Sequence, residues 1–282
     1  MIITDDFVVL NLPKTGSTFV RTVLKKVHQA RLERRPISER LAQGLGLRKR
    51  PFFQELMLAN IMVKSANGRP HQHGAWIQIP KAHRHKPIVS VMRNPYERLV
   101  SSYEFRWWVK VPPIPEEELR VHLPSFPDLT LSEFMQLRDL EVRHSRIPPV
   151  PPGTDVGLQT VQFIQMFFKD PFGILPVLDD DYLDSDRFLD DMAPVSFLRT
   201  EQLNADLHSF LLNNGFSGEE AGLVVEHEKV RVTERRNRDS AELWTDDIIH
   251  RVQRTERLLF RVLEQHGLTY EAPEVAGAGL SN

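Results

Sequence analysis

Short apolar runs alternate with longer stretches of helical spacing along the first part of the chain. Residues 7–12 form an apolar run that ends at a proline, and residues 88–92, Ile-Val-Ser-Val-Met, form another. Runs of this length and composition are typical of parallel strands that are covered on both faces. Residues 17–30 carry an apolar stripe at helical spacing, and a helix with Pro95 at its first position is expected to run to about Trp108. This repeated order of strand, loop and helix predicts an α/β fold with a central parallel sheet flanked by helices.

The later apolar patterns predict further elements. Residues 195–199 are a third strand candidate. Helical spacing predicts a second helix over 52–63, others over 158–168 and 204–214, and a long closing helix over 245–266.

A proline-rich segment interrupts this regular order. Nine prolines fall between residues 111 and 155. We therefore expect 109–155 to be an irregular insertion around one short helix near 131–137. Residues 1–270 are expected to form a single domain, and the tail 271–282 to be disordered.

Composition narrows the class of protein. The 282 residues are 41% hydrophobic and 26% charged, which is ordinary for a globular chain, and the net charge of −2 gives no general attraction for nucleic acid. The absence of cysteine excludes a disulfide scaffold, a cysteine nucleophile and a Cys-based zinc site. No stretch approaches the roughly 20 apolar residues that span a bilayer, and residues 1–6 lack the features of a signal peptide. We expect a cytoplasmic protein with no stable membrane association.

The loop after the first predicted strand has the character of an anion site. It reads Leu-Pro-Lys-Thr-Gly-Ser-Thr and leads directly into a predicted helix, whose free N–H groups and dipole favour negative charge. Gly16 permits close approach of the backbone, and Lys14 adds a positive charge. Hydroxyl donors surround the glycine on Thr15, Ser17 and Thr18. A phosphate or sulfate fits this loop. It is not a Walker A motif, and a plain strand-to-helix turn is the alternative interpretation.

The second strand ends in a comparable arrangement. Arg93 follows the strand, and Ser101 lies eight residues further on, about two turns into the predicted helix. An arginine and a hydroxyl at a strand end can bind a second phosphate, the arginine with two parallel hydrogen bonds. Two anion sites at neighbouring strand ends predict a ligand with two separated anionic groups.

The two motifs together, Leu-Pro-Lys-Thr-Gly-Ser-Thr and Arg-Asn-Pro-Tyr-Glu-Arg-Leu-Val-Ser-Ser-Tyr, resemble the nucleotide-binding signatures of sulfotransferases. These enzymes use 3′-phosphoadenosine 5′-phosphosulfate (PAPS). The resemblance implies the P-loop-like nucleotide-binding fold of that family. It also implies that the loop from Lys14 to Phe19 binds the 5′-phosphosulfate and that Arg93 and Ser101 bind the 3′-phosphate.

The closest resemblance is to the Golgi carbohydrate group of that family, which includes heparan sulfate 2-O-sulfotransferase. The Lys-Thr-Gly form of the first loop and the stretch 71–105 are similar to that group, whereas 109–155 has no counterpart there. The resemblance implies that the acceptor is a carbohydrate hydroxyl, with a small-molecule alcohol or phenol as the alternative. We expect the insertion 109–155 to lie on the acceptor side.

Transfer of a sulfuryl group requires positioning, charge stabilisation and a base. Lys14 is placed to stabilise the phosphate as it leaves. In the carbohydrate group a histidine before the second strand is the catalytic base, and His71 and His73 are the candidates here. Spacing favours His73, with His71 as a partner or substrate ligand. Glu55 is the next candidate.

Other interpretations of these residues stay open. Two His-x-His units could bind zinc across a hairpin, although the basic residues around the second unit would repel a cation, so no metal is expected. The basic run 231–238 could reach the nucleotide or be solvated surface. A nucleotide-dependent kinase and a non-catalytic nucleotide-binding module are the alternative classes. The histidines are His71, His73, His83 and His85, and the arginines of the basic run are Arg231, Arg235 and Arg236.

Overall fold

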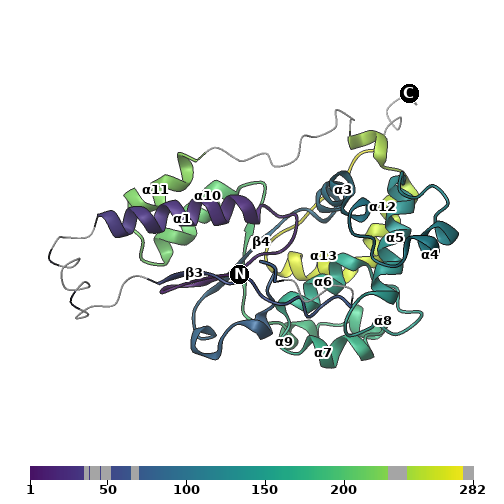
Figure 1. Ribbon diagram of the computed structural model, residues 1–282, viewed down its shortest axis with the longest axis horizontal. Coiled ribbons are helices and arrows are strands. Elements are labelled where there is room, and N and C mark those ends of the chain that lie inside the picture. Colours follow the sequence, from purple (N-terminus) through teal and green to yellow (C-terminus); the bar gives the residue numbers. More distant parts are fainter. Residues whose placement is uncertain (35–37, 39–44, 46–51, 65–69, 228–239, 276–282) are drawn as a thin grey trace.

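A five-stranded sheet forms the centre of the computed structural model, which describes residues 1–34, 38, 45, 52–64, 70–227 and 240–275 (Figure 1). The strand order across the sheet is β3-β1-β2-β4-β5. The strands are β1 (Ile2–Thr4), β2 (Val8–Leu10), β3 (Phe53–Glu55), β4 (Ile88–Met92) and β5 (Ser196–Arg199).

The sheet is mixed, so the prediction of a central parallel sheet is confirmed only for three strands. β2, β4 and β5 run parallel, with Val9 opposite Val89 and Ser90 opposite Phe197. β1 is antiparallel to both of its neighbours, β2 and β3. The connection from β1 to β2 is only three residues long, and such a short connection can join only antiparallel strands.

Helices cover both faces of the sheet. The helices α1, α10 and α11 pack on one face, where they lie together in Figure 1, and α6 and α13 pack on the other. The helices α3, α5 and α12 form a third packed group. The helices are α1 (Ser17–Glu33), α3 (Pro95–Phe105), α4 (Glu116–His122), α5 (Leu131–His144), α6 (Leu158–Phe167), α7 (Pro171–Ile174), α8 (Asp180–Leu183), α9 (Phe188–Asp191), α10 (Leu203–Asn213), α11 (Gly218–Val225), α12 (Asp246–Thr255) and α13 (Arg257–Gln265).

The strand β4 shows why its residues form a buried strand. Ile88 and Met92 pack in the cluster with α6 and α13, whereas Val89 and Val91 pack in the cluster with α1. Ser90 is also fully buried, and its hydroxyl donates a hydrogen bond to the carbonyl of Leu10 at 2.7 Å. The one polar residue of the run is therefore satisfied, as burial requires.

Several predicted elements differ from the structure. Residues 52–63 contain the strand β3 and no helix, because Phe53 to Glu55 pair with β1 at the edge of the sheet. The segment 109–155 contains two helices rather than one short one, and they pack around the buried Trp108. Of these helices, α5 begins where predicted, behind a capping box of Thr130 and Glu133, but it continues to His144 and is twice the predicted length.

The predicted closing helix is interrupted at Glu256, which separates α12 from α13. Glu256 instead caps the N-terminus of α6. The buried carboxylate of Glu256 accepts hydrogen bonds from the N–H groups of Gln159 at 3.1 Å and Thr160 at 2.6 Å, and from the Thr160 hydroxyl at 2.7 Å. A Cβ at Gly157 would lie 2.1 Å from the same carboxylate, so only glycine fits there. The α6 N-terminus is thus capped by a residue about a hundred positions later.

Candidate functional site

The carboxyl ends of the three parallel strands meet at one edge of the sheet, and the segments that follow them are bonded together. Thr200, directly after β5, donates its N–H to the carbonyl of Met92 at the end of β4, at 2.8 Å. Its hydroxyl oxygen lies 2.9 Å from the same carbonyl and 2.8 Å from the carbonyl of Thr15 in the loop after β2. In open α/β sheets this edge is where ligands bind.

The loop after β2 holds the backbone in an unusual conformation. Lys14 has φ of 67° and Gly16 has φ of 97°, so two residues of one short loop lie in the left-handed region. For the lysine this costs on the order of 1 kcal/mol. Gly16 is the N-cap of α1 and brings no side-chain cap, and the first turn of α1 contains no acidic residue. The N–H groups of this turn therefore have no side chain of α1 to satisfy them, as suits an anion site.

Lys14 extends along the neighbouring helix α3. Its Nζ lies 4.0 Å from the centre of the Phe105 ring, a cation–π contact that fixes the ammonium group. Burial lowers the pKa of Lys14, the charge of Arg93 lowers it further, and Glu104 opposes both effects. A cation that is partly desolvated and close to a second cation stabilises an incoming anion strongly.

The hydroxyl groups of the loop have different surroundings. Thr15 is fully buried, and its hydroxyl donates to the carbonyl of Leu12 at 2.9 Å, so this hydroxyl is already engaged within the loop. Ser17 is buried and Thr18 half-buried at the start of α1. Phe19 packs in the core beneath the sheet edge, and only its backbone could contact a nucleotide.

The second motif lies at the start of α3, as predicted. The Asn94 side chain caps the helix by accepting from the N–H of Tyr96 at 2.9 Å, and Pro95 occupies the first turn. Arg93 is half-buried, and one of its nitrogens lies 3.1 Å from the Glu97 carboxylate. Ser101 is half-buried on the same helix, and its hydroxyl has no hydrogen-bond partner among the described residues.

Arg98 joins the two motifs, and the sequence analysis missed it. Its guanidinium is buried, donates from Nε to the carbonyl of Pro13 at 3.0 Å, and bonds Gln159 and Gln162 of α6 at 3.3 and 2.6 Å. Burial lowers the pKa of Arg98 to about 9. The one sequence signal was an arginine on the apolar side of a predicted helix, five residues after Arg93. Arg98 thus fixes the carbonyl that precedes Lys14.

His73 is held against the same loop. Its Nδ1 lies 2.7 Å from the carbonyl oxygen of Asn11, so Nδ1 carries the proton and donates it, which leaves the lone pair on Nε2. Burial lowers the pKa of His73 to about 4, although the Asn11 carbonyl opposes the shift. The side chain is therefore a neutral imidazole at physiological pH, the form that a general base requires.

The neighbouring candidates are placed differently. His71 accepts a hydrogen bond at Nδ1 from the backbone N–H of His73 at 2.9 Å, and its Nε2 is buried with no partner among the described residues. Neither nitrogen of His71 is thus free to take a proton from an acceptor. Glu55 lies on β3 rather than on a helix, with its carboxylate 3.1 Å from Lys25 Nζ and 3.9 Å from Arg21 Nε.

The structure gives no support to a zinc site. Within residues 1–34, 52–64, 70–227 and 240–275, no three His, Asp or Glu side chains lie close enough together to hold a metal ion. His83 instead stacks on Phe52, with ring centres 5.6 Å apart. Arg231, Arg235 and Arg236 lie outside the described residues. Among the helices that the structure describes, none has the length and apolar character to cross a membrane.

Comparison with models of known protein families gives no match, and comparison with curated proteins finds no relative. The structure shows an α/β protein with a partly parallel sheet, in which the loop after β2, the start of α3 and the His73 imidazole lie at the ends of neighbouring strands. Any functional assignment rests on that geometry and on the motifs themselves.

The pKa of His73 predicts a pH-dependent stability. The unfolded chain titrates His73 near 6.5 and the folded protein near 4, so between these values the unfolded state binds more protons and stability falls as the pH falls. At pH 4.5 His73 should cost about 2–3 kcal/mol relative to pH 7. Urea unfolding at both pH values should show a smaller loss for His73→Gln, which cannot gain charge. Equal losses in the two proteins would contradict the burial of this imidazole.

Proposed function

We propose that this protein is a sulfotransferase that moves a sulfuryl group from PAPS to an acceptor hydroxyl. The observation that carries the proposal is the placement of the His73 imidazole on Asn11, at the start of the loop that also holds Lys14 and the α1 N-terminus. A base, a cation and an anion-type helix start meet in that one loop. The resemblance of both motifs to the sulfotransferase signatures supports the same chemistry.

In the proposed reaction the donor's phosphosulfate group lies at the α1 N-terminus, between the N–H groups of the loop and Lys14. The acceptor oxygen attacks sulfur while its proton passes to Nε2 of His73. The bond between sulfur and the bridging oxygen breaks, and both electrons stay with that oxygen on the leaving nucleotide, 3′-phosphoadenosine 5′-phosphate (PAP). Lys14 stabilises this charge as it develops. The products are the sulfate ester, PAP and a protonated His73.

The 3′-phosphate of the nucleotide is assigned to Arg93 and Ser101, which follow β4. The ion pair of Arg93 with Glu97 is partly solvent-exposed, and exposed pairs of this kind contribute less than about 1 kcal/mol. A phosphate dianion competes successfully with such a carboxylate, since it carries more charge and can bind the guanidinium with two hydrogen bonds.

Arg93→Ala is expected to weaken the binding of PAP far more than the binding of adenosine 5′-phosphate, which lacks the 3′-phosphate. The loss of a charge-assisted contact should cost on the order of 2–3 kcal/mol, or about 30- to 150-fold in Kd. Calorimetric titration of both nucleotides measures the difference. Arg106→Ala, at an arginine beyond the end of α3 that pairs with Asp128, is the matched control. Equal losses for both nucleotides would remove Arg93 from the 3′-phosphate site.

A carbohydrate hydroxyl is the proposed acceptor, and a small-molecule alcohol or phenol is the alternative. The proposal places the acceptor beside the segment 109–155, which folds as two helices against α3. Incubation with labelled PAPS and separate pools of oligosaccharides and small alcohols or phenols tests both acceptor classes. Tighter binding of ATP than of PAP would favour a kinase, and PAP binding without turnover on any pool would favour a non-catalytic module.

A further inference from the structure

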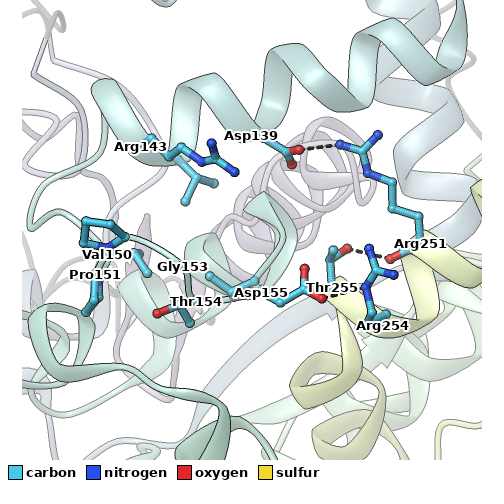
Figure 2. Close-up of a pocket in the computed structure, with 13 residues that line it drawn as sticks. Asp139, Arg143, Val150, Pro151, Gly153, Thr154, Asp155, Arg251, Arg254 and Thr255 are labelled. Carbon is cyan, nitrogen blue, oxygen red and sulfur yellow. Dashed lines mark hydrogen bonds and ion pairs between the residues drawn. The ribbon is translucent and has the colours of Figure 1, made fainter.

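A cavity of about 380 Å³ lies between α5, the proline-rich loop 150–156 and α12 (Figure 2). Its volume falls within the range of small-molecule sites. Neither the loop after β2 nor the second motif contributes to its lining. The cavity is therefore separate from the residues assigned above to the nucleotide.

Three arginines and two aspartates are among the residues that line this cavity, which gives it a net positive charge. Arg251 of α12 forms an ion pair with Asp139 of α5, and Arg254 Nε lies 2.6 Å from the Asp155 carboxylate. Arg143 makes no ion pair or hydrogen bond with any described residue. In Figure 2 it extends from the same helix as Asp139. The Arg143 side chain is exposed and forms no direct pair with a described residue, although its charge acts on nearby Asp139, whose pKa burial raises and Arg143 lowers.

The remaining wall is apolar and well anchored. Val142, Val150 and Val156 are buried beside the cavity, and Pro151 and Pro152 restrict the backbone of the loop. A hydrogen bond to a neighbouring segment also holds the loop in place, because the Thr154 hydroxyl donates to the carbonyl of Leu178 at 2.9 Å. The cavity thus offers an apolar surface next to a charged one and is formed before any ligand binds, so little ordering opposes binding.

We propose that this cavity is a second ligand site, which binds a small organic anion with a compact apolar body. The anionic head, a carboxylate or a phosphate or sulfate monoester, binds the unpaired guanidinium of Arg143. The apolar body packs against the valines and prolines of the loop. Arg254 also binds the anionic head once its exposed ion pair with Asp155 is broken, because the Asp155 carboxylate and the ligand compete for the same guanidinium.

Calorimetric titration of the full chain with benzoate, phenyl phosphate and inorganic sulfate tests the proposal. Wild-type protein should bind the two organic probes in the millimolar range or below, and more tightly than sulfate, which has no apolar body. Arg143→Gln should weaken binding at least about tenfold through loss of a charge-assisted contact. Asp155→Asn should tighten it several-fold, since removing the competing carboxylate frees Arg254.

Two controls separate this site from other anion sites. Arg120→Gln changes an exposed arginine of α4 outside the cavity, and Lys14→Ala changes the loop assigned to the nucleotide. Both variants should bind the organic probes as wild type does. Loss of binding in Lys14→Ala would place the anion in the nucleotide loop. Unchanged binding in Arg143→Gln, or no saturable binding of either organic probe below about 10 mM, would overturn the proposal. The affinity for PAP is measured in a separate titration. If the protein does not bind PAP, the sulfotransferase proposal fails, but the result for the cavity still stands.

Discussion

Replacement of His73 by alanine is expected to abolish turnover while the affinity for PAP stays nearly unchanged. The imidazole donates from Nδ1 to Asn11 and keeps its lone pair on Nε2, and in the proposed reaction this lone pair takes the proton of the acceptor and has no part in binding the nucleotide. General-base catalysis contributes about 10²- to 10⁴-fold in rate, and the loss of kcat should lie in this range. Steady-state kinetics and a PAP titration on the same preparation measure the two quantities.

The rate of the wild-type protein should fall only in acid. A base must be unprotonated to act, and with a pKa of about 4 His73 remains so from neutral pH down to that value. The His73→Ala variant should lack this acidic limb. His71→Ala is the matched control and should lower kcat far less, because neither of its ring nitrogens is free to take a proton from the acceptor. If His71→Ala were inactive and His73→Ala active, His71 would be the catalytic base instead of His73.

Lys14→Ala is expected to lower kcat by about 10²- to 10³-fold, with a much smaller change in the Kd for PAP. Charge on the bridging oxygen develops mainly in the transition state, so the ammonium group stabilises that state more than the bound ground state. Single-turnover rates with saturating PAPS isolate this effect. Lys110→Ala, at an exposed lysine beyond α3, should leave the rate unchanged.

An unchanged kcat in Lys14→Ala would remove this residue from the chemical step. Its left-handed backbone and its contact with Phe105 would then serve the structure of the loop alone. Equal losses in kcat/KM and in PAP affinity would instead indicate that Lys14 binds ground state and transition state alike.

The sequence predicts an element well where local pattern and burial agree. β4 was predicted at its observed bounds, Ile88–Met92, because five residues covered on both faces form a short apolar run. Residues 52–63 also have helical spacing, yet Leu56, Leu58 and Ile61 reach the core from non-helical backbone beyond β3, where Leu58 forms a β-bridge with His71. The structure of this segment is determined by its pairing with β1, and the local sequence pattern contains no signal for such pairing.

The same distinction applies to the candidate site. Lys14 and Arg93 were predicted because each belongs to a short motif directly after a strand. Arg98 and Thr200 were missed, since their partners are the carbonyls of Pro13 and Thr15, 85 and 185 positions away. Hydrogen bonds from side chains to distant backbone leave no signature in a single sequence. Residues that hold the loops of a site in position are therefore harder to predict from the sequence than the residues of its motifs.

The cap that Glu256 places on α6 has a consequence for synthesis on the ribosome. Arg98 depends on Gln159 at the start of α6, and that start depends on Glu256. At about 5–20 residues per second, roughly 8–30 s separate the appearance of Arg98 from that of Glu256. During this interval the nascent chain holds both anion motifs without the cap that secures their shared support. The motifs, although encoded first, are therefore expected to reach their final geometry only after the closing helices have emerged.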